Sequence, residues 1–329
     1  MRIVSLAWSH SLLGYSNHPD MFKRIHLLKS PHDYVGWIMY RLCPNLMSER
    51  FYLEMNYLFT KREHLDLDNP KTFNEKIQWL KIYDRNPLYT LLVDKYLVKE
   101  WVAKTIGEEY VIPLIAKYNT PEEIDPEQLP NQFVLKCNHD SGSVIICKDK
   151  TSFDFEDARR KLSQCLAKDT SSLFGQWAYR NVPRCIIAEP YLKDGDHGEL
   201  MDYKFFCFNG IPKIMYMSRD HAVDVTTDFF DMDFNHLPIR MQAPPSAILP
   251  NKPEQFEKMK ELAGILSKGI PQVRVDFYVI NNHIYFGEMT FYHCAGIVTV
   301  QPPEWNLKMG EMITLPPKRT NRDKSRRPY

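Results

Sequence analysis

An arginine, two acidic residues and a threonine near the C-terminus have the types and spacing of a site for phosphate and a metal ion. Arg274 and Asp276 lie two residues apart in an apolar run, and Glu288 and Thr290 have the same spacing in the next run. Residues two apart in a strand share one face of it. Facing carboxylates repel each other unless a cation lies between them, and Mg²⁺ prefers oxygen ligands and usually also holds substrate phosphates. Arg274 could bind a phosphate oxygen through two hydrogen bonds, which completes the outline of a nucleotide–metal site.

Whether the two carboxylates face each other depends on the turn between the two runs. A two-residue loop at 281–282 pairs Asp276 with Gly287 and sends Glu288 to the opposite face. A three-residue loop that includes His283 places Asp276 directly across from Glu288. We expect the three-residue loop. The alternative is a surface ion pair within the first strand and an unrelated Glu288.

Two lysines lie within otherwise apolar strands. Lys136 belongs to the run 133–138 and Lys204 to the run 203–208. A lysine in so apolar a strand is costly to desolvate unless it meets an anion, and phosphate is a natural partner. An edge-strand lysine that extends to water is the alternative for either residue.

A loop of small and polar residues follows the strand of Lys136. Its residues are His139, Asp140, Ser141, Gly142 and Ser143. Backbone N–H groups of such a loop can face phosphate oxygens, but the loop matches no Walker or dinucleotide pattern, and a plain hairpin turn is the alternative.

The end of a later apolar strand is a candidate for binding a flat heterocycle such as adenine. Pro190 removes a backbone donor and ends ladder pairing, which frees neighbouring main-chain groups. The segment consists of Glu189, Pro190, Tyr191 and Leu192. A plain strand end is the alternative.

Helices and hairpins are expected around these residues. Asn209-Gly210 is the strongest short hairpin signal, and Thr72 with Glu75 forms a capping box at the start of a helix. The acidic, proline-marked stretch 121–130 is expected to be a boundary. Further expected elements are a helical pattern from 86 to a stop at Gly107, a hairpin formed by 133–138 and 143–148, a helix at 153–168, a strand at 185–192, a hairpin within 203–217, a helix at 253–270 and a hairpin at 273–291.

Composition excludes several classes of protein. The 329 residues are 44% hydrophobic and 25% charged with a net charge of +1, which is typical of globular chains and gives no field that would attract nucleic acid. No apolar run approaches the roughly 20 residues of a spanning helix, and the N-terminal apolar stretch is too short for an export signal. Seven cysteines without a C-x-x-C pair favour a reducing compartment and argue against structural zinc. The basic tail from Lys318 is expected to be solvated, with an anionic membrane face as the alternative.

Several separated motifs resemble the TupA-like ATP-grasp family, over roughly residues 65–315. They include Phe133-Val-Leu-Lys-Cys-Asn-His139, Asp202-Tyr-Lys-Phe-Phe-Cys-Phe-Asn-Gly210, Arg274-Val-Asp-Phe-Tyr278, Tyr285-Phe-Gly-Glu-Met-Thr-Phe291, Asn69-Pro-Lys-Thr-Phe-Asn-Glu-Lys-Ile-Gln-Trp-Leu80, Asp84-Arg-Asn-Pro-Leu-Tyr-Thr90 and Asp94-Lys-Tyr96. Agreement over several motifs is far more specific than one glycine pattern.

The resemblance implies an α+β fold of the ATP-grasp type, in which two α+β subdomains clamp ATP, with a helical N-terminal extension. It implies the following segments: a helical extension at 1–68, a helical part at 69–130, a subdomain with phosphate loop and adenine strand at 131–192, a subdomain with the metal site at 193–317 and a basic tail at 318–329.

The resemblance also implies roles. Lys136 and Lys204 would hold the α- and β-phosphates, and the loop, with Asn138 before it, would close over the γ-phosphate. Residues 189–192 would line adenine, Arg274 with Lys204 would act in catalysis, and Asp276, Glu288 and Thr290 would hold Mg²⁺. The implied reaction joins a carboxylate on a sugar or amino acid to an amine, through an acyl phosphate, during bacterial surface-polysaccharide synthesis. A cytoplasmic location is expected, with contact of the tail at the inner face of the membrane as the alternative.

Asp140, Ser143, His293 and Cys294 depart from the usual family pattern, and Thr290 stands where broader ATP-grasp enzymes often have asparagine. An additional carboxylate beside a polyphosphate should weaken nucleotide binding. Two other functions stay open. The D-x-D motif Asp231-Met-Asp233 suggests a glycosyltransferase that uses a sugar nucleotide, and Asp140 suggests a non-catalytic relative.

Overall fold

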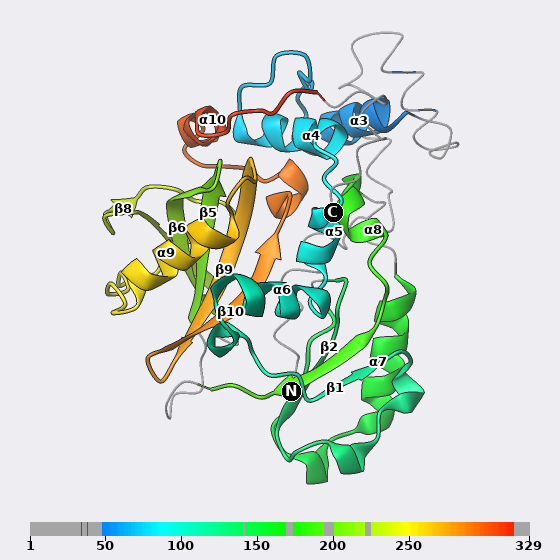
Figure 1. The fold of residues 1–329 in the computed structure, drawn as a ribbon. Helices are drawn as coiled ribbons and strands as arrows, with labels where there is room; N and C mark the ends of the chain where they lie inside the picture. Colours follow the sequence, from blue (N-terminus) through cyan, green and yellow to red (C-terminus); the bar gives the residue numbers. More distant parts are fainter. Residues whose placement is uncertain are drawn as a thin grey trace.

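The computed structural model describes residues 34, 38, 48–140, 142–168, 174–193, 201–220 and 225–318. In this part of the chain, antiparallel strands form two sheets, and helices pack around them (Figure 1). The two sheets belong to separate hydrophobic cores. The expected α+β class is therefore confirmed. Ser141, nearly all of residues 1–47 and the tail after Lys318 lie outside the described residues, and the expectations for them stay predictions. Among the described residues, no helix has the length and apolarity needed to cross a membrane.

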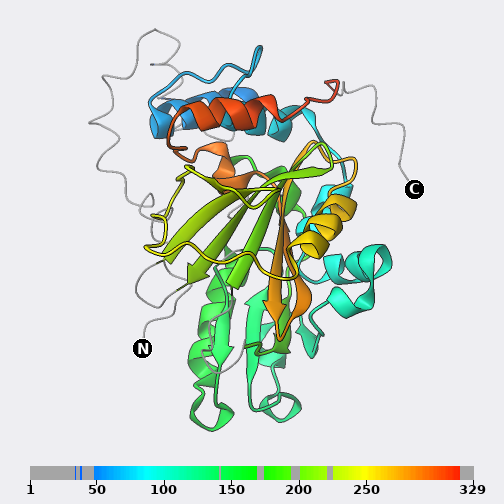
Figure 2. The same ribbon diagram turned by 90° about the vertical axis from the view of Figure 1, so that its left-hand side faces the viewer.

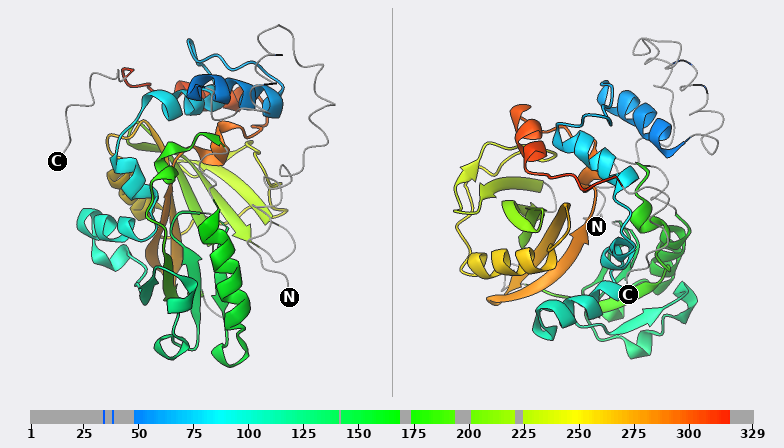
Figure 3. Two further views of the ribbon diagram at one scale, coloured as in Figure 1. Left: turned by 90° about the vertical axis from the view of Figure 1, so that its right-hand side faces the viewer. Right: turned by 45° about the horizontal axis from the view of Figure 1, so that its top comes forward.

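Helices from both ends of the described chain form a layer at one end of the molecule. α3 (Glu49–Lys61) and α4 (Phe73–Tyr83) precede the sheets in sequence, and α10 (Glu304–Glu311) lies beside α4 (Figures 1 and 3). The expected capping box of α4 is present, because the Thr72 hydroxyl accepts from the backbone of Glu75 and the Glu75 carboxylate accepts from the backbone of Thr72. The sequence therefore fixes where α4 begins.

The helical pattern expected from 86 to 107 is broken into α5 (Leu88–Val93) and α6 (Leu97–Ile106). The Asp94 carboxylate accepts hydrogen bonds from the N–H groups of Tyr96 and Leu97 and so closes the turn that leads into the second helix. Apolar periodicity continues across so short a break, which is why the sequence pattern does not reveal it. The expected stop at Gly107 is confirmed, with φ at 123°.

A four-stranded antiparallel sheet, the small sheet, has the order β1-β4-β2-β3. Its strands are β1 (Ala116–Tyr118), β2 (Phe133–Cys137), β3 (Ile145–Cys147) and β4 (Ile186–Pro190). The expected hairpin and helix are confirmed, and α7 (Phe155–Ala167) lies beside the small sheet (Figure 2). Leu162 of α7 belongs to the same buried hydrophobic cluster as Phe133 and Leu135. Because β1 precedes the stretch 121–130, the small sheet takes one strand from the segment expected to be helical.

A six-stranded antiparallel sheet, the large sheet, has the order β10-β9-β5-β6-β7-β8. Its strands are β5 (Met201–Phe208), β6 (Ile211–Asp220), β7 (Val225–Asp231), β8 (His236–Leu237), β9 (Gln272–Ile280) and β10 (His283–Thr290). α9 (Phe256–Leu266) covers one face, where Phe256 lies 6.0 Å from Phe205 between ring centres. On the other face, Phe206 lies 6.1 Å from Phe73 of α4. Burying each ring stabilises the fold by roughly 1.5–3 kcal/mol.

The turn between β9 and β10 differs from the expected three-residue loop. Ile280 pairs with His283, so the loop has two residues, both with positive φ as in the turns that match the twist of paired strands. A β-bulge at Gly287 then shifts the register by one residue, and Glu288 pairs with Asp276. The expected pairing is confirmed, but its expected cause is wrong. The other hairpin, at Asn209-Gly210, is confirmed.

The close contact of α10 with the start of α4 predicts that a methyl group at Gly310 is not tolerated. An added Cβ would lie 2.1 Å from the carbonyl oxygen of Lys71, which is backbone and cannot rotate away. We expect Gly310→Ala to lower the free energy of unfolding by about 2 kcal/mol in urea denaturation, as overpacking does. Gly264→Ala in α9 is the matched control, because its Cβ would meet only ordinary contacts. It should stabilise by about 0.5 kcal/mol. Equal effects of the two substitutions would contradict the close packing of α10.

Candidate active site

Three buried charged side chains meet on the face of the large sheet opposite α9. Arg274 donates from Nε to Asp276 Oδ1 at 2.7 Å and from Nη2 to Oδ2 at 2.6 Å. Lys204 pairs with Asp276 across β5 and β9, and its Nζ lies 3.1 Å from Asp276 Oδ2 and 3.0 Å from Asp202. Exposed fractions are 3% for Arg274, 1% for Asp276 and 8% for Lys204. Strand pairing thus holds two cations and a carboxylate together out of water.

Glu288 and Thr290 of β10 join this group. Arg274 Nη2 donates to Glu288 Oε1 at 3.1 Å and to Thr290 Oγ1 at 2.9 Å. The Thr290 hydroxyl in turn donates to Glu288 Oε1 at 2.9 Å. Lys95, from the break between α5 and α6, lies 3.6 Å from Glu288 Oε2. The residues expected to form one site therefore do lie together, while their roles stay predictions.

Neighbouring charges keep these groups ionised despite burial. Burial alone would lower the pKa of Arg274 and of Lys204. Asp276 nevertheless raises the pKa of Arg274 well above its ordinary value, and Asp202 and Asp276 together raise that of Lys204 well above its own. Burial would raise the pKa of Glu288, but Lys95 and Arg274 lower it to about 2. At neutral pH the cluster is a set of mutually compensated ions.

The pair Asp276 and Glu288 fits Mg²⁺. Both carboxylates accept from the same nitrogen of Arg274, so their oxygens face one small region. Within the described ranges no group of three or more acidic, histidine or cysteine side chains forms a metal cage. Mg²⁺ usually takes one or two carboxylates and completes its shell with water and substrate phosphates, so two carboxylates beside Arg274 are a fitting donor set.

A second charged group lies in the small sheet. Glu189 of β4 is 4% exposed, and its two carboxylate oxygens lie 2.7 Å from Lys99 Nζ and 2.7 Å from Lys136 Nζ. Burial would raise the pKa of Glu189, but Lys136 and Lys99 lower it. Burial lowers the pKa of Lys99, with Glu189 opposing. Lys136 is thus neither exposed nor unpaired, and Glu189 holds it in place.

A narrow pocket connects the two sheets. Its lining includes Lys95, Lys99, Lys136 and Glu189 on one side and the bulge residue Gly287 on the other. It encloses about 10 Å³, roughly the space of one water molecule. A ligand larger than a water molecule therefore fits this cleft only if the cleft opens.

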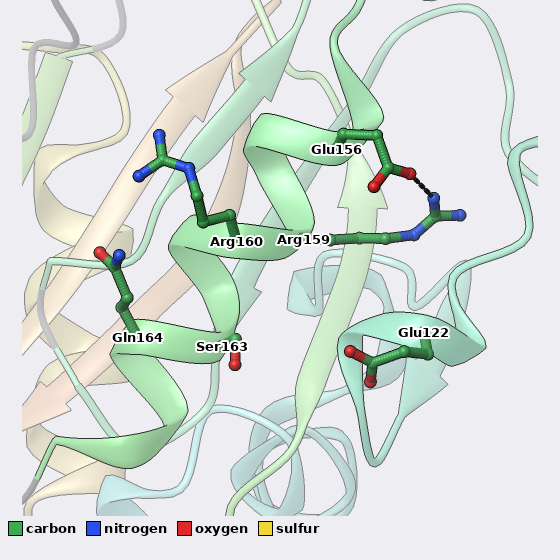
Figure 4. A pocket seen from close by; sticks show the side chains of 6 residues that line it. All are labelled: Glu122, Glu156, Arg159, Arg160, Ser163 and Gln164. Carbon is green, nitrogen blue, oxygen red and sulfur yellow. Dashed lines mark hydrogen bonds and ion pairs between the residues drawn. The ribbon is translucent and has the colours of Figure 1, made fainter.

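A hollow on the outer side of α7 involves none of these residues. It is lined by Glu122, Glu156, Arg159, Arg160, Ser163 and Gln164 (Figure 4). Glu156 and Arg159 are paired there at 2.5 Å, and the carboxylate is mostly exposed. Such a pair contributes little and indicates a solvated helix surface.

The loop expected to close over phosphate is tied to the break between α5 and α6. Lys95 Nζ donates to the backbone oxygen of Asp140 at 2.6 Å, and the Asp140 carboxylate accepts from the Ser143 hydroxyl. The Asn138 amide donates to Asp94 at 2.9 Å and accepts from the N–H of Cys185 at 2.8 Å. Asn138 therefore holds the loop in place.

The remaining predicted binding residues flank these contacts. His139 is buried, and burial lowers its pKa, whereas Gly142 is exposed with open space around it. Pro190 ends β4, and Tyr191 and Leu192 follow it half-buried. Lys148 Nζ lies 5.8 Å from the ring centre of Tyr191.

A left-handed turn follows β10. Tyr292, Cys294 and Ala295 have φ of 56°, 47° and 54°, and the short helix η8 (His293–Gly296) lies within the turn. Each such non-glycine residue costs roughly 1–2 kcal/mol. Arg274 Nη1 lies 2.8 Å from His293 Nδ1. Burial, and after it the positive charge of Arg274, holds the pKa of His293 well below its ordinary value. A neutral His293 thus accepts a hydrogen bond from Arg274.

Cys294 and the D-x-D motif lie in surroundings that do not favour the chemistry their residue types suggest. Burial raises the pKa of Cys294 to about 12, so its thiol is a poor nucleophile. The Asp231 carboxylate accepts from the N–H groups of Asp233 and Asn235 at 2.9 and 2.8 Å. This pattern closes the turn after β7.

Sequence reasoning missed Lys95, Lys99 and Asp202, and treated His293 only as a departure from the family pattern. The two lysines are four residues apart, which on a helix indicates one face, and Asp202 shares a strand face with Lys204. Those spacings are detectable signals. Nothing in the sequence indicates the turn that brings His293 to Arg274.

The buried position of Glu189 predicts a large loss of stability on neutralisation. Glu189→Gln leaves two lysines without their counter-charge, so the free energy of unfolding should fall by about 3 kcal/mol. Glu254→Gln, an exposed glutamate, should change it by less than about 0.5 kcal/mol. A Glu189→Gln protein as stable as wild type in urea would refute the paired arrangement.

The lowered pKa of Glu288 predicts a specific pH dependence. A carboxyl with a folded pKa of about 2 adds stability above its ordinary value near 4.5 and loses it as pH falls toward 2. Because the side chain is one-third exposed, we expect the stability difference between wild type and Glu288→Gln to narrow by only about 1 kcal/mol from pH 5 to pH 3. Urea denaturation at each pH measures it. A difference that stays constant or widens toward pH 3 would contradict the ion pairing.

Comparisons with known proteins agree with the resemblance seen in the sequence. The family model described as TupA-like ATPgrasp matches residues 75–314. No curated protein matches the chain.

Solved structures show weaker likenesses. D-alanine–D-alanine ligase from Bacillus anthracis, complexed with ATP, is 15% identical with a TM-score of 0.37, over 68% of this chain and 63% of that one. The ligase of the same name from Helicobacter pylori is 17% identical with a TM-score of 0.38, over 75% and 70%. N5-carboxyaminoimidazole synthase from Aspergillus clavatus, with ADP and 5-aminoimidazole ribonucleotide, is 14% identical with a TM-score of 0.35, over 61% and 44%.

The chain thus spans less than two thirds of two of these proteins, and scores this low carry no argument about activity. The family match covers most of the chain and includes every charged residue of the site described above. The chain belongs to the TupA-like ATP-grasp family.

Proposed function

We propose that the chain is an ATP-dependent carboxylate–amine ligase that forms an amide in bacterial surface-polysaccharide synthesis. The observation that carries the proposal is the cluster of Arg274, Lys204, Asp276 and Glu288 on one sheet face of an ATP-grasp family member. Cations and paired carboxylates so close together suit the charge of a triphosphate with Mg²⁺. The polysaccharide role rests on the family resemblance alone. The cytoplasmic location rests on the cysteine pattern, and contact with the inner membrane face, the alternative, rests on the basic tail.

The reaction begins with attack of a substrate carboxylate oxygen on the γ-phosphorus of ATP. The bond from that phosphorus to the β,γ-bridging oxygen breaks, and ADP leaves. An amine then attacks the acyl phosphate carbon, loses a proton, and inorganic phosphate leaves with the amide formed. The protein supplies position and charge, and no side chain becomes covalently attached.

Each predicted residue has a role in this scheme. Lys136 and Lys204 hold the α- and β-phosphates, and Arg274 steadies the transferred phosphoryl group. Residues 138–143 close over the γ-phosphate, and residues 189–192 line adenine. Asp276 and Glu288, with Thr290 beside them, would hold Mg²⁺, which would neutralise charge on the phosphate oxygens. Lys95 and Lys99 line the same pocket and are candidates for further phosphate contacts. The segment boundaries at 69, 131, 193 and 318 stay part of the proposal.

The nearest competing function, a sugar-nucleotide glycosyltransferase, has no support in the site. Its D-x-D motif is used to close a turn. A non-catalytic role would rest on Asp140, whose carboxylate bonds to Ser143 within the loop.

Trapping the activated acid tests the proposal. With ATP, Mg²⁺ and a uronic or amino acid, hydroxylamine should yield a hydroxamate together with one ADP per product, because it attacks an acyl phosphate as the amine would. We expect Glu288→Gln to reduce this rate by about 100-fold or more, as loss of a transition-state charge partner does. Glu254→Gln should stay within twofold of wild type. The wild-type protein could be stabilised against heat by Mg²⁺ and ATP and yet form no hydroxamate with any tested acid. That result would exclude activation of these acids by the protein. Full activity in Glu288→Gln would exclude the metal role.

A further inference from the structure

One face of α4 carries buried polar side chains that the proposed reaction does not use. Asn74, Gln78 and Lys81 lie at helical spacing and are no more than 1% exposed. A helix packed against a core normally buries an apolar stripe, so a polar one needs partners. Its partners lie in the segment that follows β10.

The polar stripe binds the main chain of the left-handed turn. Lys81 Nζ donates to the carbonyl oxygen of Ala295 at 2.7 Å, and Gln78 Nε2 donates to the carbonyls of Ala295 and Gly296, each at 2.9 Å. Asn74 Nδ2 donates to the carbonyl of Val298 at 2.7 Å. Ala295 and Gly296, which supply three of these four contacts, both have a left-handed backbone.

Lys81 is the residue with the greatest cost of burial in this contact. Its other acceptors are Gln78 Oε1 at 3.0 Å and the carbonyl of Phe174 at 2.8 Å, so all its hydrogen-bond partners among the described residues are neutral. Burial lowers its pKa to about 7. A lysine is rarely buried without a counter-charge, which indicates that its hydrogen bonds to the turn have a purpose beyond packing.

The turn that Lys81 holds carries a direct contact to the proposed phosphate-binding arginine. His293 lies between the strained residues Tyr292 and Cys294, and its Nδ1 lies 2.8 Å from Arg274 Nη1. Gly296 allows α4 to approach, since a Cβ there would lie 2.6 Å from Ile77. Strained residues persist only where surrounding contacts hold them.

We propose that Lys81, with Gln78, is a positioning residue: it holds the left-handed turn at 292–296 and thereby sets His293 against the guanidinium of Arg274. The part of this inference that concerns ATP rests on the proposed function. The position of His293 is independent of that function and can be measured in the nucleotide-free protein.

The experiment combines histidine NMR with nucleotide binding. In ¹⁵N-histidine-labelled protein, the signal lost in His293→Gln identifies His293, which should be neutral with Nδ1 unprotonated. Lys81→Met should shift or split that signal and weaken Mg·ATP binding at least fivefold in calorimetry. Lys76→Met is the matched control, because Lys76 Nζ also donates from α4 to a backbone carbonyl, that of Ile313 at 2.8 Å, away from the turn. It should leave the His293 signal unchanged and ATP affinity within twofold.

Two further variants separate positioning from general destabilisation. Ala295→Gly permits the left-handed backbone without strain, so adding it to Lys81→Met should restore the His293 signal at least in part. If Lys81→Met does not fold, Gln78→Met removes two hydrogen bonds to the same carbonyls and should shift the same signal. An unchanged His293 signal in a folded Lys81→Met or Gln78→Met protein overturns the inference, as does an equal effect of Lys76→Met. If Lys81→Met shifts the His293 signal but the wild-type protein does not bind Mg·ATP, the positioning role is supported and the proposed function is rejected.

Discussion

Compensation of buried charge is the constraint on which the rest of this structure depends. Removing one ion from water costs several kcal/mol even after relaxation, so each buried charge of the site needs a partner of opposite sign. Asp276 lies between Arg274 and Lys204, and Glu189 lies between Lys99 and Lys136. The strand pairings, the helix break and the bulge all place such partners in contact. Under the proposed function, the protein must meet this requirement before a nucleotide binds, because the cations lie together without the phosphates.

Local irregularities achieve the placement. The break at Asp94 brings Lys95 to Glu288, and the bulge at Gly287 moves Glu288 opposite Asp276. The left-handed turn brings His293 to Arg274, and the polar face of α4 holds that turn. Regular strand pairing brings Lys204 to Asp276, whereas the contacts of Lys95, Glu288 and His293 come from points where regularity is interrupted.

The sequence predicted the regular parts well, because they follow from local chemistry. The capping box at Thr72, the hairpin at Asn209-Gly210 and the pairing of Asp276 with Glu288 were all predicted, although the last for a wrong reason. A one-residue bulge compensates for a one-residue difference in loop length, so the alternation of residues alone cannot distinguish them. The partners of the lysines were not predicted either. An apolar strand context shows that Lys136 is buried, but not that Glu189, more than fifty residues later, lies beside it. Neutralising Lys136 or Lys204 would therefore take one of two cationic partners from Glu189 or from Asp276.

The central claim is that the carboxylates now engaged with Arg274 and Lys204 form the metal site when nucleotide binds. Opening of the narrow cleft and entry of the phosphates would give the cations new anionic partners, which frees oxygens of Asp276 and Glu288 for Mg²⁺. A crystal structure with Mg²⁺ and a non-hydrolysable ATP analogue tests this most directly. The account predicts Mg²⁺ with an oxygen of Asp276 and an oxygen of Glu288 at about 2.0–2.1 Å, and phosphate oxygens in the remaining shell. A nucleotide bound elsewhere, or Mg²⁺ held without either carboxylate, would contradict it.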